Sequence, residues 1–275
     1  MTIQNSKLKI PSKIIVANWK MNPASPKEAD MLLKRIWINK DKKLANLEVI
    51  IAPPFIYLEP LLLKAKSLRL KAEFGAQDCF WENQGAYTGE ISSLMLKNLG
   101  AEYVIVGHSE RRSYLKETDE IIAKKIKIVF ENKLTPVLCV GETAEQRVKG
   151  AQKNVVQEQL NKDLREIKNL KNRNLVVAYE PVWAIGTGNY CQPEEALEMI
   201  KFIKEILNLN FSQLSGEKNI KVLYGGSVDS KNISSYIKYQ DIDGVLVGGA
   251  SIKINEFRKI IDEVFKAAEI KSAKK

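Results

Sequence analysis

Short runs of apolar, mostly β-branched residues alternate along the chain with longer segments in which apolar residues recur every three or four positions. The short runs are typical of strands buried on both faces, and the longer pattern is typical of amphipathic helices. The predicted strands span residues 14–17, 48–52, 70–76, 103–106, 136–140, 175–179, 221–224 and 244–247. The predicted helices between them include residues 26–39, 119–132, 152–167, 193–209, 231–238 and 255–268.

This order predicts eight strand–helix units, spaced by about 30 residues as parallel strands with crossover helices are. Eight such units close most naturally into a single-domain (β/α)8 barrel of the α/β class, for which 275 residues is a suitable length. A doubly wound open sheet is the alternative. A dinucleotide binder of that kind would need a Gly-x-Gly-x-x-Gly turn after the first strand, where this chain has NWKMN at residues 18–22. We expect flexible tails at residues 1 to about 12 and 271–275.

Composition narrows the class of protein. Hydrophobic residues make up 45% of the chain, which is enough for a large core. No apolar run approaches the roughly 20 residues of a membrane helix, and no apolar secretion signal follows the lysines near the N-terminus. The chain has three cysteines, an odd number, and they lack the short spacing of a metal site: Cys79, Cys139 and Cys191. We therefore expect reduced thiols, a cytoplasmic protein, and neither a membrane partner nor a metal site.

The net charge of +10 raises the question of nucleic-acid binding. The lysines are scattered over all the predicted helices and form neither a stripe nor a platform interleaved with aromatic residues. We therefore expect no nucleic-acid partner, and a solvated basic surface that favours small anions.

Polar residues with useful chemistry are concentrated directly after the predicted strands. Asn18 and Lys20 follow the first strand, a Gly-His-Ser-Glu sequence at residues 107–110 follows the fourth, and Glu180 follows the sixth. The carboxyl ends of all strands in a barrel lie at one end, which is where such enzymes have their active sites. This distribution predicts a single catalytic site.

Glu180 is the candidate general base. Apolar residues of the predicted strand lead directly into it, and Pro181 both ends the strand and favours an extended conformation at Glu180. The segment after Pro181 is apolar at first and then rich in glycine, with Gly186 and Gly188, which is typical of a flap that closes on short hinges. An arbitrary glutamate would be a solvated surface residue, but these neighbours favour a carboxylate base beneath a lid.

His108 is the only histidine in the chain and follows an apolar strand just before a predicted helical turn. The amides and dipole of such a turn disfavour a positive imidazolium, so a neutral ring could donate a hydrogen bond to a carbonyl oxygen. Lys20 would attract an anionic substrate and stabilise an oxyanion. Ser109 and Glu110 are predicted to support the site, although Glu110 could instead form a surface ion pair with the arginines that follow it.

Two glycine pairs follow the last two predicted strands, in the sequences GGS (residues 225–227) and GGA (residues 248–250). Glycine lets the backbone approach an anion closely, and barrels commonly bind phosphate with the loops after strands seven and eight. Either pair alone could be a tight turn. Together with Gly186 of the flap, they favour a phosphate site.

The sequence resembles the triosephosphate isomerase family over essentially its whole length. The shared motifs are NWKMN (18–22), GAQD (75–78), GAYTGEIS (85–92), EYVIVGHSERR (102–112), CVGET (139–143), YEPVWAIGTG (179–188), YGGSV (224–228) and DGVLVGGAS (243–251). Phe80, Trp81 and Ile252 are less usual in that family, but they lie outside the catalytic positions.

The resemblance implies a TIM barrel that interconverts dihydroxyacetone phosphate and D-glyceraldehyde 3-phosphate through an enediolate, in glycolysis and gluconeogenesis. In that reaction Glu180 is the base, His108 the electrophile, and Asn18 and Lys20 bind the substrate. No cofactor or metal is expected. The residues implied to bind the phosphate are Gly186, Ser227, Gly248 and Gly249.

The resemblance also implies a homodimer in which residues 77–90 insert into a second subunit, with Thr88 near the partner's active site. A loop of this length could instead pack on itself at the surface. Cys139 is expected to support the base from behind, since no second histidine exists to activate its thiol. Two other functions stay open: a different phosphate-binding barrel enzyme, and a non-catalytic binding protein with the same fold.

Overall fold

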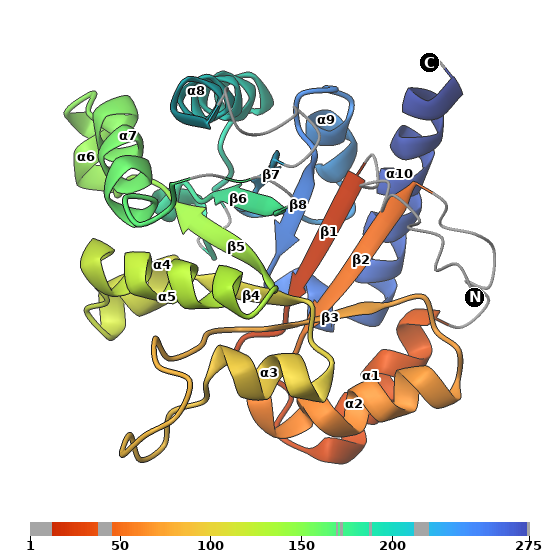
Figure 1. The fold of residues 1–275 in the computed structure, drawn as a ribbon. Helices are drawn as coiled ribbons and strands as arrows, with labels where there is room; N and C mark the ends of the chain where they lie inside the picture. The colour runs from red at the N-terminus through yellow and green to blue at the C-terminus, as the bar shows by residue number, and fades with distance from the viewer. Residues whose placement is uncertain are drawn as a thin grey trace, which may run out of the picture.

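A closed, eight-stranded parallel barrel forms the centre of the molecule (Figure 1). The computed structural model describes residues 13–37, 46–168, 170, 173–186, 189–211 and 220–273. Neighbouring strands pair in chain order, and β1 also pairs with β8 to close the barrel. The strands are β1 (Lys13–Asn18), β2 (Leu47–Ala52), β3 (Glu73–Ala76), β4 (Tyr103–Val106), β5 (Thr135–Val140), β6 (Leu175–Tyr179), β7 (Ile220–Tyr224) and β8 (Gly244–Val247). The predicted (β/α)8 barrel is therefore confirmed.

Side chains alternate across the wall of the barrel. In β1, for example, Ile14 and Val16 belong to the cluster inside the barrel, whereas Ile15 and Ala17 belong to the cluster between barrel and helices. Both clusters are buried: the closed barrel encloses the inner one, and the helices cover the outer one, as Figure 1 shows. This explains why the strands lack the polar alternation of a half-exposed sheet.

Helices surround the barrel between successive strands (Figure 1). They are α1 (Pro26–Trp37), α2 (Phe55–Ser67), α3 (Ser93–Leu99), α4 (Ser109–Tyr114), α5 (Asp119–Glu131), α6 (Ala144–Val148), α7 (Gln152–Asp163), α8 (Pro193–Phe211), α9 (Ile233–Ile237) and α10 (Ile254–Ala273), with the short 3-10 helices η1 (Val182–Ala184) and η2 (Gly249–Ile252). Within the part of the chain that the structure describes, no helix is both long and apolar enough to cross a membrane.

Several predicted boundaries were wrong. Residues 70–72 are not part of β3, because the chain turns at Arg69, which has a positive φ of 52°, and the Leu70 amide caps the carbonyl of Ala65. α7 ends at Asp163 and not at residue 167. α9 begins only at Ile233, because the amides of residues 231 and 232 bond to the carboxylate of Asp229.

The predicted ends of the chain lie only partly within the described residues. Residues 1–12, 274 and 275 lie outside them, as do residues 38 and 39 of the first predicted helix. Residues 271–273, which were expected to belong to a flexible tail, continue α10.

The connection between β3 and α3 is the golden segment that extends away from the barrel at the lower left of Figure 1. Its aromatic side chains pack on one another: the Phe80 ring lies 4.0 Å from that of Trp81 and 4.6 Å from that of Tyr87, measured between centroids. The Phe80 amide donates to the carbonyl of Ile91 across the base of the loop. The loop is thus a defined structure that leaves Thr88 exposed at its surface.

Candidate active site

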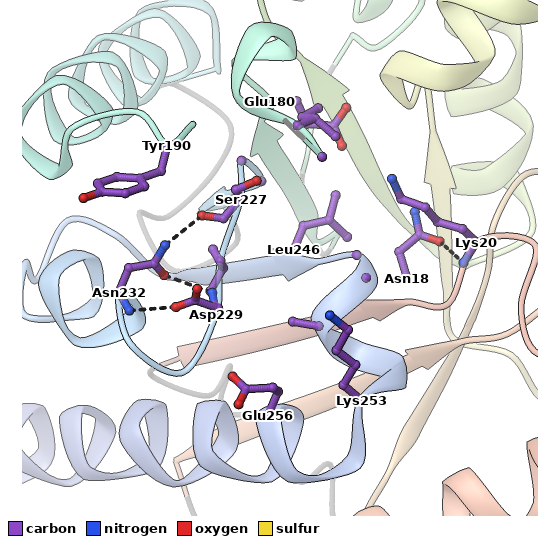
Figure 2. A pocket seen from close by; sticks show the side chains of 18 of the residues that line it. Asn18, Lys20, Glu180, Tyr190, Ser227, Asp229, Asn232, Leu246, Lys253 and Glu256 are labelled. Carbon is purple, nitrogen blue, oxygen red and sulfur yellow. Dashed lines mark hydrogen bonds between the residues drawn. The ribbon is translucent and has the colours of Figure 1, made fainter. Parts of the chain in front are cut away.

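A cavity of 760 Å³ opens at the carboxyl ends of the strands (Figure 2). Residues from β1, β4, β6, β7 and β8, or from the segments that follow them, line it. Its lining includes Asn18, Lys20, His108, Glu180, Ile185, Gly186, Ser227, Leu246, Gly248 and Gly249. The candidate residues for substrate binding and catalysis therefore lie around one space, as the sequence predicted.

Glu180 points into this cavity because of the alternation along β6. Val176 and Ala178 face the inside of the barrel, and Glu180 is the next residue of the same parity. Gly225 leaves room for it, since a Cβ atom there would lie only 3.0 Å from Glu180 Cγ. The side chain is buried, with 2% of its surface exposed, so its carboxylate is shielded from bulk water.

The Glu180 carboxylate lies against the start of α4 in this structure. Its Oε2 accepts a hydrogen bond of 3.0 Å from the Ser109 amide. Its Oε1 lies 3.2 Å from His108 Nε2 but has no hydrogen-bond partner among the described residues. One carboxylate oxygen is thus available to take up a proton within reach of the imidazole.

Cys139, the last residue but one of β5, is buried inside the barrel. Burial, and secondarily the charge of Glu180, raise the pKa of the Cys139 thiol well above its ordinary value. The thiol is therefore protonated and unsuited to nucleophilic attack. The expected role of Cys139 as a support of the base stays a prediction.

His108 is the N-cap residue of α4. Its Nδ1 accepts a hydrogen bond of 3.2 Å from the Glu110 amide. Because a ring nitrogen that accepts a hydrogen bond carries no proton, the imidazole is neutral and its proton is on Nε2. Nε2 is the nitrogen nearer to Glu180, so the ring can donate a hydrogen bond toward the centre of the cavity.

Lys20 has a left-handed backbone conformation, with φ at 53°, which is unusual for a residue other than glycine. Its amide donates to Asn18 Oδ1 at 3.0 Å (Figure 2), and its carbonyl accepts from Gln77 Nε2 at 2.8 Å. Its Nζ pairs with Glu110 Oε1 at 2.6 Å. Glu110 therefore contacts a lysine of the cavity and not the arginines that follow it in the chain. A Cβ atom on Gly248 would lie 3.0 Å from Lys20 Cε, which explains the glycine opposite this side chain.

The opposite side of the cavity is made by the turns after β7 and β8. A Cβ atom on Gly249 would meet no described atom within 4 Å, so this backbone faces open space. Asn232 Nδ2 donates to the Ser227 carbonyl at 3.2 Å, and the Asp229 amide donates to Asn232 Oδ1 at 3.0 Å (Figure 2). These side chains fix the turn that presents Ser227 to the cavity.

The segment after Glu180 is anchored at its start. Trp183 Nε1 donates to Glu142 Oε1 at 2.8 Å, and the Tyr179 hydroxyl donates to the same buried carboxylate. Farther along, Ile185 and Gly186 line the cavity, and Gly186 has a positive φ of 69°. Thr187 and Gly188, which belong to the predicted flap, lie outside the described residues.

Several residues of the site were not predicted from the sequence. The side chain of Leu246 enters the cavity from β8 (Figure 2), and its inward direction follows from the strand alternation that also orients Glu180. Glu142 and Asn232 act through contacts with distant segments, for which no local pattern gives a signal. Among the residues described, no cluster of three or more His, Cys, Asp or Glu side chains is arranged to bind a metal ion.

Together these groups suit a proton transfer beside a carbonyl. A shielded carboxylate can take the proton, while a neutral donor and a cation can stabilise the oxygen on which charge develops. Backbone amides near Ser227 and Gly249 can bind an anionic group at the other end of a small substrate.

Comparison with known proteins agrees with this geometry. The family model described as "Triosephosphate isomerase" matches residues 13–264. The protein named triosephosphate isomerase from Dictyoglomus turgidum is 44% identical over 251 residues, covering 90% of this chain and 98% of that protein. The proteins of the same name from Clostridium tetani and Carboxydothermus hydrogenoformans are 42% and 44% identical, each over 90% of this chain and over 95% and 96% of their own lengths. The chain therefore belongs to the triosephosphate isomerase family.

Proposed function

We propose that the protein is an isomerase that interconverts dihydroxyacetone phosphate and D-glyceraldehyde 3-phosphate, in glycolysis and gluconeogenesis in the cytoplasm. Membership of the family and the names of the relatives support this reaction. The observation that carries it is the convergence of Glu180, His108 and Lys20 on one cavity. A barrel that only bound phosphate would have no need of a shielded carboxylate next to a neutral imidazole.

In this proposal Glu180 removes a proton from the carbon beside the carbonyl and returns it to the neighbouring carbon. The two transfers require one carboxylate that acts first as base and then as acid. The hydrogen bond from the Ser109 amide stabilises the charged carboxylate before substrate binds. Cys139 supports it from the barrel side.

His108 and Lys20 stabilise the enediolate oxygens. The imidazole does so as a neutral donor, because its Nδ1 is occupied by the Glu110 amide. The ammonium group of Lys20 supplies a positive charge, and Glu110 holds it at the edge of the cavity until substrate arrives. Asn18 contributes by fixing the strained backbone of Lys20 and by lining the cavity itself.

The substrate phosphate is bound by the backbone of Gly186, Ser227, Gly248 and Gly249 in the proposal. The first of these lies on the segment after β6 and the others on the turns after β7 and β8, so phosphate binding would draw this segment over the site. Closure would exclude water from the enediolate, which in solution can expel its phosphate.

A coupled isomerase assay tests the function directly. We expect turnover of both triose phosphates and competitive inhibition by 2-phosphoglycolate, a planar mimic of the enediolate, at concentrations far below those at which inorganic phosphate inhibits. A different phosphate-binding barrel enzyme would show no isomerase activity. A non-catalytic binding protein would show none either and would not prefer the mimic to inorganic phosphate.

We further propose that the protein is a homodimer through the loop of residues 77–90. Large apolar side chains are exposed in the single chain: Met21 follows Lys20, Tyr87 lies on the loop, and Tyr114 and Leu115 lie at the end of α4. The exposed fractions of Met21 and Tyr114 are 93% and 80%, and such exposure of large apolar side chains is typical of a surface that another chain covers. Thr88 would then approach the partner's site.

Light scattering at micromolar concentration is expected to give twice the mass of the chain. Tyr87→Glu would introduce a charge into the proposed contact and is expected to shift the protein toward the monomer with a lower kcat. Leu209→Glu, at a more exposed apolar position on α8, is the control and should leave the mass unchanged. A monomeric wild-type protein with full activity would contradict the dimer and leave the isomerase proposal intact.

A further inference from the structure

Cys191 is the last residue but one of the segment between β6 and α8, which begins at Pro193. The Cys191 residue is fully buried, whereas Tyr190 before it lines the cavity and is 49% exposed. The Cys191 carbonyl accepts a hydrogen bond of 2.5 Å from the Tyr236 hydroxyl of α9. A side chain 45 positions away therefore fixes one peptide plane at the end of this segment.

Tyr236 is a rigid donor for this bond. Its ring is fully buried and stacks on Tyr224, the last residue of β7, with ring centroids 4.2 Å apart and planes at 15°. Burial is the main cause that raises the pKa of Tyr236 to about 12, so the phenol is protonated and donates at physiological pH. The hydroxyl is thus positioned against the barrel wall itself.

The side chain of Cys191 is held as well. Its Sγ lies 3.7 Å from Glu195 Oε2, and Glu195 pairs with Arg147 at 2.8 Å. The guanidinium of Arg147 in turn lies over the ring of Trp183, 5.0 Å from its centroid. Cys191 therefore has a fixed carbonyl and a fixed side chain, and its contacts lead back to the start of the same segment.

From these contacts we infer that Tyr236 is a positioning residue that fixes the end of the closing segment over the active site. The inference rests on the proposed function, in which Ile185 and Gly186 close over the substrate. With the Cys191 peptide plane fixed, rotation is confined to the dihedral angles before it, and few closed arrangements are accessible. Loss of the hydroxyl frees further dihedral angles, so the closed arrangement is less populated when ligand binds.

Tyr236→Phe tests this, because it removes the hydroxyl and keeps the ring that stacks on Tyr224. Tyr239→Phe is the matched control: it removes a hydroxyl that donates to Glu194, in the first turn of α8, at 2.7 Å, and leaves Cys191 untouched. We expect Tyr236→Phe to speed the dissociation of 2-phosphoglycolate, measured by stopped flow, and to lower kcat/KM, each by about three- to tenfold. Tyr239→Phe is expected to leave both within about twofold of wild type, as is usual for a surface contact.

A purely structural role of Tyr236 would give a different result. In that case Tyr236→Phe would lower Tm, while the dissociation rate and kcat/KM would match those of Tyr239→Phe, and the inference would be overturned. If the wild-type protein has no isomerase activity, the proposed function fails, and hydrogen exchange of residues 181–191 decides the inference alone. Faster exchange there in Tyr236→Phe than in Tyr239→Phe supports it, and equal exchange overturns it.

Discussion

Glu180→Asp is expected to lower kcat by about 10²-fold or more, with only a modest change in KM. The substitution keeps the carboxylate but withdraws it by one methylene from a position that β6 fixes tightly. Gly225, where an added Cβ would lie 3.0 Å from Glu180 Cγ, directly follows β7, and its amide bonds to the Tyr179 carbonyl, so it cannot move to compensate. Because the rate of proton transfer depends steeply on the distance between base and carbon, the chemical step becomes slower while the phosphate contacts remain.

Steady-state kinetics in both directions measure this effect, with 2-phosphoglycolate affinity as the check on substrate binding. Glu158→Asp, a shortening of the same size on the exposed surface of α7, controls for the exchange of glutamate for aspartate itself. A kcat for Glu180→Asp near that of wild type would refute the assignment of Glu180 as the base. A large rise in KM alone would instead place this carboxylate among the binding groups.

The barrel was predictable because its strands are covered on both faces and therefore read as continuous apolar runs. β4, β6 and β8 have the predicted bounds, β2 begins one residue earlier than predicted, and β1 is longer by one residue at each end. α2 was not among the predicted helices. Pro60 lies inside it, and a proline usually indicates the end of a helix. Exposed apolar residues such as Ile56 and Leu63 also hide the one-sided apolar pattern of an amphipathic helix.

The candidate site was predictable where it depends on position along a strand. Glu180 and Asn18 follow inward-facing residues of β6 and β1 by two positions, and the strand ends bring them together. Contacts between distant segments were not predictable. The bond from Gln77 to the Lys20 carbonyl and that from Tyr236 to the Cys191 carbonyl connect residues 57 and 45 positions apart, and each depends on a side-chain direction that only the folded structure defines.

A cluster of charged side chains is a second example of contacts that the sequence did not predict. Lys125 pairs with Asp78 and Glu117, and Arg111 pairs with the same two carboxylates. Burial is the main cause that raises the pKa of Asp78 to about 6. The motifs that contain these residues gave no sign that two cations from α4 and α5 and two anions from the segments after β3 and α4 form one cluster.

His108→Gln is expected to lower kcat by about 10²- to 10³-fold, the usual effect of losing one well-placed donor to a developing oxyanion. A glutamine amide can donate a hydrogen bond, but it lacks the ring that the Glu110 amide fixes through Nδ1, so its donor is not held toward the substrate. We also expect a changed proportion of substrate proton exchanged with solvent, since a less stable enediolate changes how the intermediate partitions.

The same substitution removes the N-cap of α4, which alone costs about 1 kcal/mol of stability. Thr118→Ala separates the two effects, because Thr118 caps α5 through the Ile121 amide and lies outside the cavity. It should lower Tm to a similar degree and leave kcat unchanged. If His108→Gln lowers Tm in the same way and leaves kcat and proton exchange unaltered, the imidazole only caps a helix, and the enediolate must be stabilised by Lys20 and the backbone amides alone.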